Sequence, residues 1–319
     1  DGCLCLVGSE MCIRDSLVFM GVYAIGNPAD VLISPDATEA ERADIVRHFG
    51  LDKPLYAQYG LFLANAAKGD LGGYFKYNEP ALGLIAERVP ATLEIAFAAL
   101  FLTILVGIPL GLLCGLKPDA PWSKMIMGFS AFGFSVPSFW LGLMMVMVFS
   151  VFLGWLPASG RGQTRDLFGI PFSFLTLDGL RHMLLPAFNL ACFKLSLVIR
   201  LTRAGTQEVV RIDYIKYAKA KGLRPARVIF VHVLKNTHLP IVTVLGLEFG
   251  RTIAFATVTE TVFARPGMGK LLIDSIGVLD RPVIVAYLMM IDVMFIAINL
   301  IVDLVYTALD PRVRLEERR

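Results

Sequence analysis

The side chains with the clearest capacity for chemistry are charged residues inside strongly apolar stretches. Glu248 and Arg251 are three positions apart in one such stretch, so on a helix they share a face and can pair. Pairing lowers the cost of burying each charge, and carboxylates inside a membrane can carry protons. One interpretation is therefore an ion-coupled secondary transporter that uses Asp292, Glu248 and Arg251. We expect Glu94 and Glu260 to lie near the ends of their stretches, within reach of water.

The sequence contains no pattern typical of an enzyme site. Its four histidines are scattered, and its five cysteines show no spacing typical of a metal site or a disulfide framework. A phosphate-binding loop of the form G-x-x-x-x-G-K-S/T is missing, because Gly267–Lys270 lacks that spacing. We therefore expect no catalytic residue, no metal site and no directly bound cofactor.

A basic segment, residues 200–240, lies between two apolar stretches. Apolar positions in it recur every three residues, whereas its lysines fall mostly on other faces, which predicts a short amphipathic helix. Gly222 suits the left-handed backbone that ends a helix, and Pro225 suits the first turn of a second short helix through Val233. The sequence thus predicts a helix, a tight turn and a helix outside the membrane. The recurring apolar positions are Val209, Ile212, Ile215 and Ala218.

Three interpretations of this basic segment stay open. Its first helix could be rigid and transmit a displacement from a separate protein to the apolar stretches on either side. Alternatively, its lysines could hold that helix flat on anionic lipid. A charge run of this kind could also be a solvated loop.

The composition places these features in a membrane protein. Hydrophobic residues make up 56% of the 319 residues and charged residues 18%, which is far from a soluble domain. Four stretches are apolar enough to cross a bilayer, and a fifth, residues 240–263, carries three charges. With an incomplete first helix at residues 17–25, we predict an all-α integral membrane protein with six transmembrane helices, the first of them truncated or replaced. The four clearest stretches are residues 91–116, 125–156, 182–199 and 283–309.

The sequence also predicts how the chain divides into segments. Residues 1–16 match neither a signal peptide nor a spanning helix, and we expect them to be non-native, resembling translated adapter or vector sequence. Residues 26–90 form a polar insertion with nine acidic and six basic residues. Residues 91–314 form the core, which includes the segment 200–240, and residues 315–319 form a tail.

Lysine and arginine mark one side of the predicted membrane protein. They bracket a connection at Lys117 and Lys124, number nine between Arg200 and Lys235, and recur four times after residue 310. By the positive-inside rule this side is the cytoplasm. We therefore expect both termini and the basic segment in the cytoplasm, and residues 26–90 outside.

Prolines and glycines inside the predicted spans have two open interpretations. They could loosen helices along a path that must open and close, or the small residues could permit close helix packing. The two groups are Pro109 with Gly107 and Gly111, and Pro137 with Gly133 and Gly142. Our candidate pathway or gating residues are Pro137, Glu248, Arg251, Glu260 and Asp292.

Several short motifs occur in order along residues 17–314. Any one of them is weak, but the ordered set resembles the permease subunits of binding-protein-dependent ABC importers, within them the dipeptide, oligopeptide and nickel branch. The motifs are Gly69–Gly72, Pro90–Glu94, Ser135–Trp140, Leu156–Gly160, His182–Pro186, Asp213–Leu223, Thr259–Phe263, Pro266–Gly269 and Asp310–Arg312.

This resemblance implies the type I ABC importer permease fold, in a bacterial or archaeal cytoplasmic (inner) membrane, and an ATP-driven import of short peptides. It implies a second homologous permease as a heterodimer partner, two cytoplasmic ATPase subunits that hold ATP and Mg²⁺, and an extracytoplasmic solute-binding protein. Membrane lipid is a further expected partner, and no nucleic acid is expected to bind.

The basic segment resembles the cytoplasmic loop by which this superfamily contacts its ATPase. The family pattern is Glu-Ala-Ala, three residues, Gly, nine residues, Ile, one residue, Leu-Pro. Ala218, Gly222 and Leu234 match this pattern, whereas Lys216, Tyr217, His232 and Lys235 depart from it. The resemblance implies that the ATPase-coupling residues are Asp213, Tyr214, Ala218, Ala220, Gly222, Leu223 and Leu234.

Overall fold

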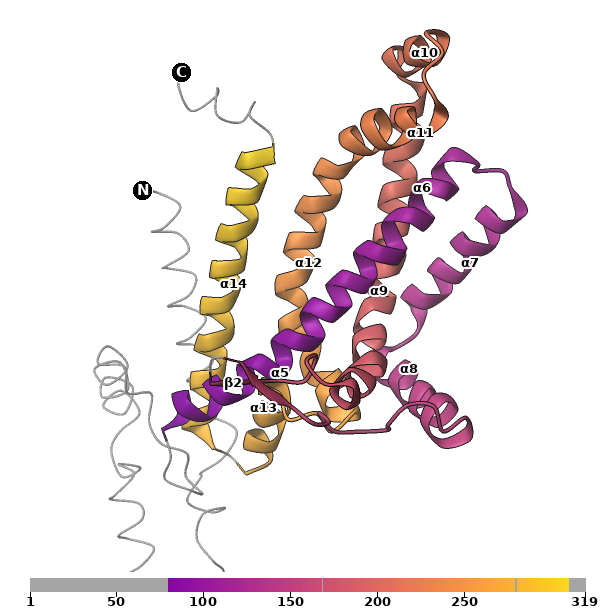
Figure 1. Ribbon diagram of the computed structural model, residues 1–319. Coiled ribbons are helices and arrows are strands. Elements are labelled where there is room, and N and C mark those ends of the chain that lie inside the picture. The colour runs from indigo at the N-terminus through magenta and orange to yellow at the C-terminus, as the bar shows by residue number, and fades with distance from the viewer. Residues whose placement is uncertain (1–79, 168, 279, 310–319) are drawn as a thin grey trace, which may run out of the picture. The chain divides into compact units, whose positions relative to one another are not determined.

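The computed structural model describes residues 80–167, 169–278 and 280–309 (Figure 1). The predictions for residues 1–79 and 310–319, which include the first helix, most of the polar insertion and the tail, lie outside the described residues. The described chain is mostly helical, which confirms the predicted fold class; a short hairpin of two antiparallel strands was not predicted. The elements are α5 (Ala81–Leu102), the π-helical turn η1 (Thr103–Gly107), α6 (Ile108–Leu116), α7 (Pro121–Ser135), α8 (Ser138–Met145), η2 (Val146–Phe152), β1 (Arg165–Leu167), β2 (Ile170–Phe172), α9 (Leu177–Arg211), α10 (Asp213–Ala220), α11 (Pro225–Arg227), η3 (Val228–Val233), α12 (Leu234–Val262), α13 (Met268–Gly277) and α14 (Arg281–Leu309).

Among the described residues, four helices are long and apolar enough to cross a membrane, and a bent pair makes up to one more. The first of them begins at Ala81, ten residues before the predicted start of that span. Strong helix formers precede Pro90, and a proline inside an apolar helix removes one backbone hydrogen bond without ending the helix. The four helices are Ala81–Leu116, Leu177–Arg211, Pro240–Val262 and Pro282–Val302.

The stretch predicted as one span at residues 125–156 is broken instead. α7 ends at Ser135, α8 begins at Ser138, and the two helical halves are bent by 108°. Val136 and Pro137 between them have extended backbones, with ψ of 130° and 132°. The physical reason is that a proline ring disfavours helical geometry in the residue before it. Both sides of the break are apolar, so hydropathy alone did not reveal it.

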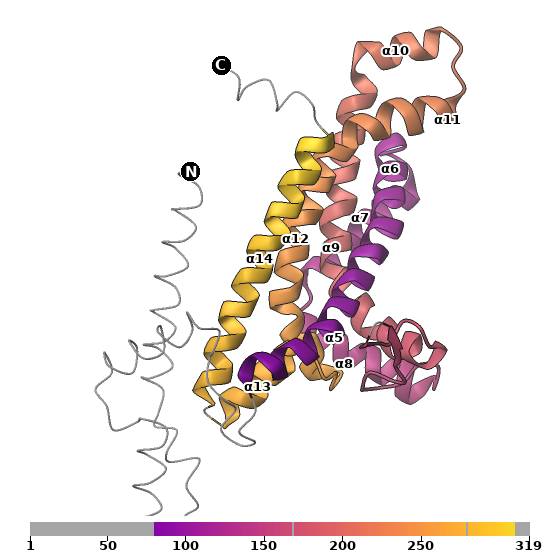
Figure 2. The same ribbon diagram turned by 60° about the vertical axis from the view of Figure 1, so that its left-hand side comes forward.

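α9 is the helix against which α6, α7 and α12 pack, and α6, α9 and α12 run side by side in Figures 1 and 2. Three glycines allow the close approach of α6 and η1 to α9. A Cβ built at Gly111 would lie 2.6 Å from Cβ of Thr202 and 2.8 Å from the carbonyl oxygen of Ile199. The structure therefore supports close packing, rather than loosening, as the role of these glycines. The facing pairs are Gly107 with Val198, Gly111 with Thr202, and Gly115 with Thr206.

The glycines of α7 and α8, the two helices on either side of the break, differ in how closely other atoms approach them. A Cβ at Gly142 on α8 would meet Cγ1 of Val262 at 3.1 Å, so Gly142 also permits close packing. At Gly133 on α7 the nearest atom is the carbonyl oxygen of Cys192, at 3.9 Å. Packing therefore explains Gly142 and leaves Gly133 beside open space.

Replacing Gly111 by alanine is expected to destabilise the α6–α9 contact by about 1–3 kcal/mol, because both facing atoms belong to a packed helix. The measurement is the heat-induced unfolding midpoint of the purified protein in detergent. Gly128→Ala on α7 is the matched control, since no atom lies within 4 Å of a Cβ built there. Equal midpoints for the two variants would contradict the packing role.

The chain divides into two compact units, Asp1–Pro90 with Pro266–Met294, and Ala91–Arg265 with Phe295–Arg319. In the first unit, Lys270 and Asp274 form an ion pair of 2.7 Å on α13. Asp280 accepts the backbone N–H of Val283 at the start of α14, at 3.3 Å. The second unit contains all the groups described in the next section, apart from Asp292.

Candidate functional site

The predicted helix, turn and helix are present and form an arm, residues 212–233, at one end of α9 and α12 (Figures 1 and 2). Gly222 has φ of +75°, which confirms the predicted left-handed turn. Pro225 occupies the first turn of α11, also as predicted. The second helix does not stop at Val233, because the backbone stays helical from η3 into α12.

The first helix of the arm is shorter than predicted. α9 continues to Arg211, so Val209 belongs to that helix. Ile212 has an extended backbone, with ψ of 142°, and separates α9 from α10. Its side chain is exposed, so the prediction that Ile212 lies on the buried face is wrong. Ile215 and Ala218 are buried, as the three-residue spacing predicted.

An apolar cluster joins α10 to two spanning helices, α6 and α9, and to η3. Ile215 of α10 is fully buried and belongs to this cluster together with Leu112 of α6, Val209 of α9, and Val228 and Val233 of η3. Partly buried Leu223, one of the predicted coupling residues, packs against the same cluster. Because packed interiors deform little, this cluster ties the position of α10 to that of the neighbouring helices.

Polar contacts fix α10 against the start of α12. The hydroxyl of Tyr214 donates to the carbonyl oxygen of His232 at 3.1 Å and accepts from Nδ2 of Asn236 at 2.5 Å. Lys216 pairs with Asp213 at 2.8 Å. Burial raises the pKa of Tyr214, and the hydrogen bond from Lys216 lowers the pKa of Asp213. Tyr214 therefore stays a neutral donor at neutral pH, and Asp213 stays an anion.

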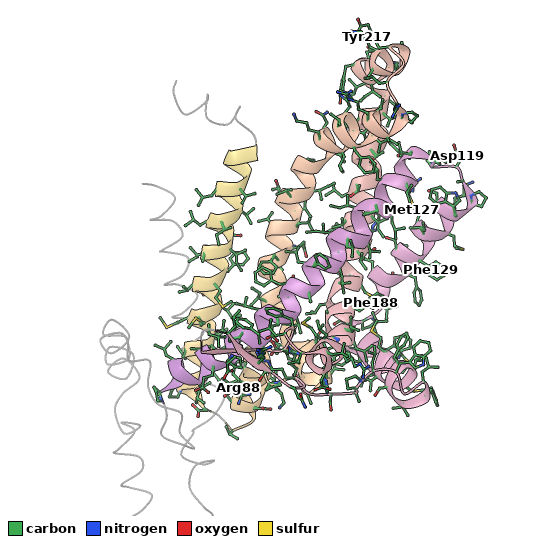
Figure 3. The ribbon with its side chains drawn as sticks, in the orientation of Figure 1. Arg88, Asp119, Met127, Phe129, Phe188 and Tyr217 are labelled. Atoms are coloured by element: carbon green, nitrogen blue, oxygen red, sulfur yellow. The ribbon has the colours of Figure 1, made fainter. Side chains whose placement is uncertain are left out.

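The outer side of the arm is open. Tyr217 is 63% exposed and lies at the tip of the arm in Figure 3. The ammonium of Lys221 lies over the Tyr217 ring, 4.7 Å from its centre. Ala220 is exposed, and Leu234 lies partly buried at the start of α12. One face of α10 is thus packed and the other presents aromatic and basic side chains.

Two basic regions of the second unit share one end, as their charge predicted. The α6–α7 connection, marked by Asp119 in Figure 3, and the arm lie at the same end of α9 in both ribbon views. The hairpin and α8 lie at the opposite end. An amphipathic helix that lies on lipid turns its apolar face outward, whereas Ile215 on α10 faces the protein.

A cavity of about 500 Å³ opens at the break between α7 and α8. It brings together three of the candidate pathway residues, Pro137, Glu248 and Arg251. Gly133 is also in its wall, which accounts for the open space beside that glycine. The wall residues are Gly133–Ser138, Leu141, Asn189, Leu190, Cys192, Phe193, Lys194, Glu248, Arg251, Phe255, Val258 and Thr259.

The charges in the cavity wall form a group of three. Nη1 of Arg251 donates to Oε1 of Glu248 at 3.1 Å, which is the pair predicted from their spacing. Nζ of Lys194 lies 4.0 Å from Oε2 of the same carboxylate. Lys194 was not among the predicted site residues, although it is the one charge in the stretch 182–199, and a charge inside a membrane span is a signal that marks functional residues.

The remaining two candidate pathway residues lie elsewhere. Glu260 is fully buried and accepts a hydrogen bond of 2.5 Å from the hydroxyl of Thr92. Asp292 is buried on α14 in the first unit. Neither residue is part of the cavity wall. The expectation that water reaches Glu260 is wrong, because the side chain is enclosed.

Glu94 is also buried, contrary to expectation, and lies at the centre of an ionic network. Its carboxylate accepts from Nη2 of Arg265 at 2.5 Å, from Nη2 of Arg161 at 3.0 Å and from the backbone N–H of Ser173 at 2.8 Å. The Ser173 hydroxyl also donates to it. The network joins α5, the hairpin region and the loop after α12.

Arg265 is held in place by the turn before it. Ala264 has φ of 45°, a conformation rare for alanine, and it directs the chain so that Arg265 is fully buried beside Glu94. Burial lowers the pKa of Arg265 to about 10, so its guanidinium stays charged at neutral pH. Arg265, Arg161 and Ser173 were not predicted from the sequence; the available signal was the charge of Glu94 inside a span, which requires partners.

No group of three or more His, Cys, Asp or Glu side chains in the described ranges is arranged to hold a metal ion. Two of the buried carboxylates pair with arginines: Glu94 pairs with Arg265, and Glu248 pairs with Arg251.

Several apolar spans, a cavity with three charged side chains at a helix break and a packed arm beyond the helix ends are features that fit a membrane transport subunit of the permease class. The family model described as "Binding-protein-dependent transport system inner membrane component" matches residues 107–315. The chain therefore belongs to this family of multi-pass inner-membrane permeases. The relatives below support its dipeptide branch.

Two curated relatives are similar over nearly the whole chain. The di/tripeptide transport system permease protein DppB of Pseudomonas aeruginosa (strain UCBPP-PA14) is 38% identical over 302 residues, covering 91% of this chain and 90% of the relative. The dipeptide transport system permease protein DppB of Escherichia coli (strain K12) is 36% identical over 315 residues, covering 93% of each.

A solved structure shares the fold. A chain of the MetNI methionine ABC transporter, in an inward-facing conformation, superposes with a TM-score of 0.55 and 15% identity. The match covers 71% of this chain and 96% of that chain. At this identity the likeness concerns the fold alone, and it agrees with the predicted type I ABC importer permease fold.

Proposed function

We propose that this permease subunit moves short peptides into the cell and that cytoplasmic ATPase subunits drive it through the arm. The observation that carries the proposal is the structure of α10. Its inner face is packed against α6, α9 and η3 through Ile215, and its outer face exposes Tyr217. The names of the relatives support di- and tripeptides as cargo.

In this mechanism the ATPases close on ATP and pull the arm. Because Ile215 belongs to a cluster shared with α6, α9 and η3, and Tyr214 bonds to Asn236 at the start of α12, the displacement would become a rigid-body movement of the spans. The path then opens outward to receive a peptide from a solute-binding protein, and hydrolysis resets the helices. ATP and Mg²⁺ stay on the ATPase subunits, and this chain makes no covalent chemistry.

The proposed assembly pairs this chain with a second permease, since one chain supplies half of the pathway. Two ATPases contact the basic end, and the solute-binding protein contacts the opposite end. The arm and the α6–α7 connection would face the cytoplasm, in line with the positive-inside rule. Both chain termini would lie on that side.

Uptake measurements separate this proposal from an ion-coupled transporter. Membrane vesicles that contain the complete importer are expected to accumulate labelled Ala-Ala only with ATP inside the compartment that holds the ATPases. A proton uncoupler is expected to leave this uptake intact. Uptake that survives ATP depletion and stops with the uncoupler would instead favour proton coupling through Glu248 or Asp292.

A further inference from the structure

We propose that the cavity at the α7–α8 break is a relay site that binds the carboxylate end of a short peptide on its way through this subunit. The inference rests on the proposed peptide-import function and adds the location and the chemistry of a binding step. It depends on three observations: a lysine whose ammonium has no hydrogen-bond acceptor, a second cation in the same wall, and an amide oxygen that has no hydrogen-bond donor.

The lysine is Lys194. Its side chain is 10% exposed, and its one ion pair, with Glu248 at 4.0 Å, is too long for a hydrogen bond. Among the residues that the structure describes, the ammonium donors of Lys194 therefore have no hydrogen-bond acceptor. Because the side chain is largely buried beside the cavity, a carboxylate that enters can accept charge-assisted hydrogen bonds from these donors.

Arg251 gives the same wall a second cation. Both Lys194 and Arg251 contact the carboxylate of Glu248, so their positive groups lie on either side of it. The three side chains together carry a net charge of +1, from two cations and one anion. The Arg251 side chain is 66% exposed and lines the cavity, and it binds Glu248 through Nη1. This arrangement favours an anion.

The rest of the wall suits the remainder of a peptide. Nδ2 of Asn189 donates to the hydroxyl of Thr259 at 3.1 Å, whereas its Oδ1 has no hydrogen-bond partner among the described residues, although the side chain is only 2% exposed. A peptide N–H that reaches this wall supplies the missing donor. Phe193 and Phe255 provide apolar surface for a side chain.

The size of the cavity fits this class of ligand. Its volume of about 500 Å³ lies within the roughly 300–1,000 Å³ typical of small-molecule sites. A site along a transport path must also release its ligand. Glu248 serves this need, because it competes with the peptide carboxylate for Lys194 and Arg251.

The test is equilibrium binding to the importer assembled with its partner subunits in lipid nanodiscs, without the solute-binding protein. The probes are labelled Ala-Ala and its C-terminal amide, which lacks the carboxylate. The wild type is expected to bind Ala-Ala roughly ten- to a hundredfold more tightly than the amide, as one or two charge-assisted hydrogen bonds provide.

The preference for Ala-Ala over its amide is then compared in two variants and one control. Arg251→Gln changes an exposed side chain and is expected to fold, and Lys194→Met removes the buried cation. Each is expected to bring the preference for Ala-Ala over the amide close to one. Lys124→Met, which removes an exposed lysine outside the cavity, is expected to keep the wild-type preference.

The outcomes separate this inference from the proposed function. If vesicles take up Ala-Ala but the variants bind it like the wild type, the relay site is wrong and the import function stands. If the wild-type importer takes up no peptide, the import function fails and this inference fails with it. If the wild type binds Ala-Ala and its amide equally in phosphatidylcholine discs, where no anionic lipid competes, the site does not recognise the carboxylate and the proposal is overturned.

Discussion

Gly222→Val is expected to reduce peptide uptake strongly while membrane insertion and assembly with the second permease continue. Gly222 has φ of +75°, where a β-branched residue is strained by on the order of 1–3 kcal/mol. No atom lies within 4 Å of a Cβ built there, so the whole effect comes from the backbone. The turn then relaxes and α10 moves away from η3. Coupled uptake should fall on the order of ten- to a hundredfold.

A graded series tests this explanation. Asparagine tolerates the left-handed conformation, so Gly222→Asn is expected to keep most uptake, with Gly222→Ala between asparagine and valine. Gly128→Val is the matched control, because its surroundings are equally open and its φ is not positive. The measurements are uptake of labelled Ala-Ala and co-purification of the ATPase subunits. Full uptake and full ATPase binding by Gly222→Val would show that the turn is not part of the coupling path.

Glu94→Gln is expected to lower the free energy of unfolding by about 3–5 kcal/mol, because it leaves a buried cation without its counter-charge. Arg265 is fully buried and pairs with Glu94 at 2.5 Å, and Arg161 pairs with the same carboxylate at 3.0 Å. The substitution leaves both guanidinium groups facing a neutral amide. The measurement is the unfolding midpoint of the purified protein in detergent, read from heat or denaturant scans.

Glu87→Gln on the same helix is the control, since Glu87 is exposed and its replacement should change stability by no more than about 0.5 kcal/mol. The double variant Glu94→Gln with Arg265→Met removes the strongest pair together and is expected to recover part of the loss. A double-mutant cycle then gives the coupling between the two side chains. Equal losses for Glu94→Gln and Glu87→Gln would mean that the network contributes nothing to stability.

The features that could be predicted from the sequence are those that depend on neighbouring residues. Apolar runs of sufficient length predicted the spans, since a bilayer requires such runs. The left-handed turn at Gly222 and the helix start at Pro225 were predicted because each depends on the backbone of one residue. The Glu248–Arg251 pair was predicted because residues three apart meet on a helix. Ile212 was misplaced, since a single extended residue breaks the three-residue repeat.

The sequence alone therefore determined the class of this protein, its spanning helices and the turn in its arm, because each is written in a short, continuous pattern. Only the tertiary structure decided which distant charges meet. Glu94 pairs with Arg265, which is 171 positions away in the chain, and Lys194 pairs with Glu248 on another helix. It also decided that the chain bends by 108° at Pro137 and opens a cavity there. Such contacts depend on how whole helices pack, and no local pattern records them.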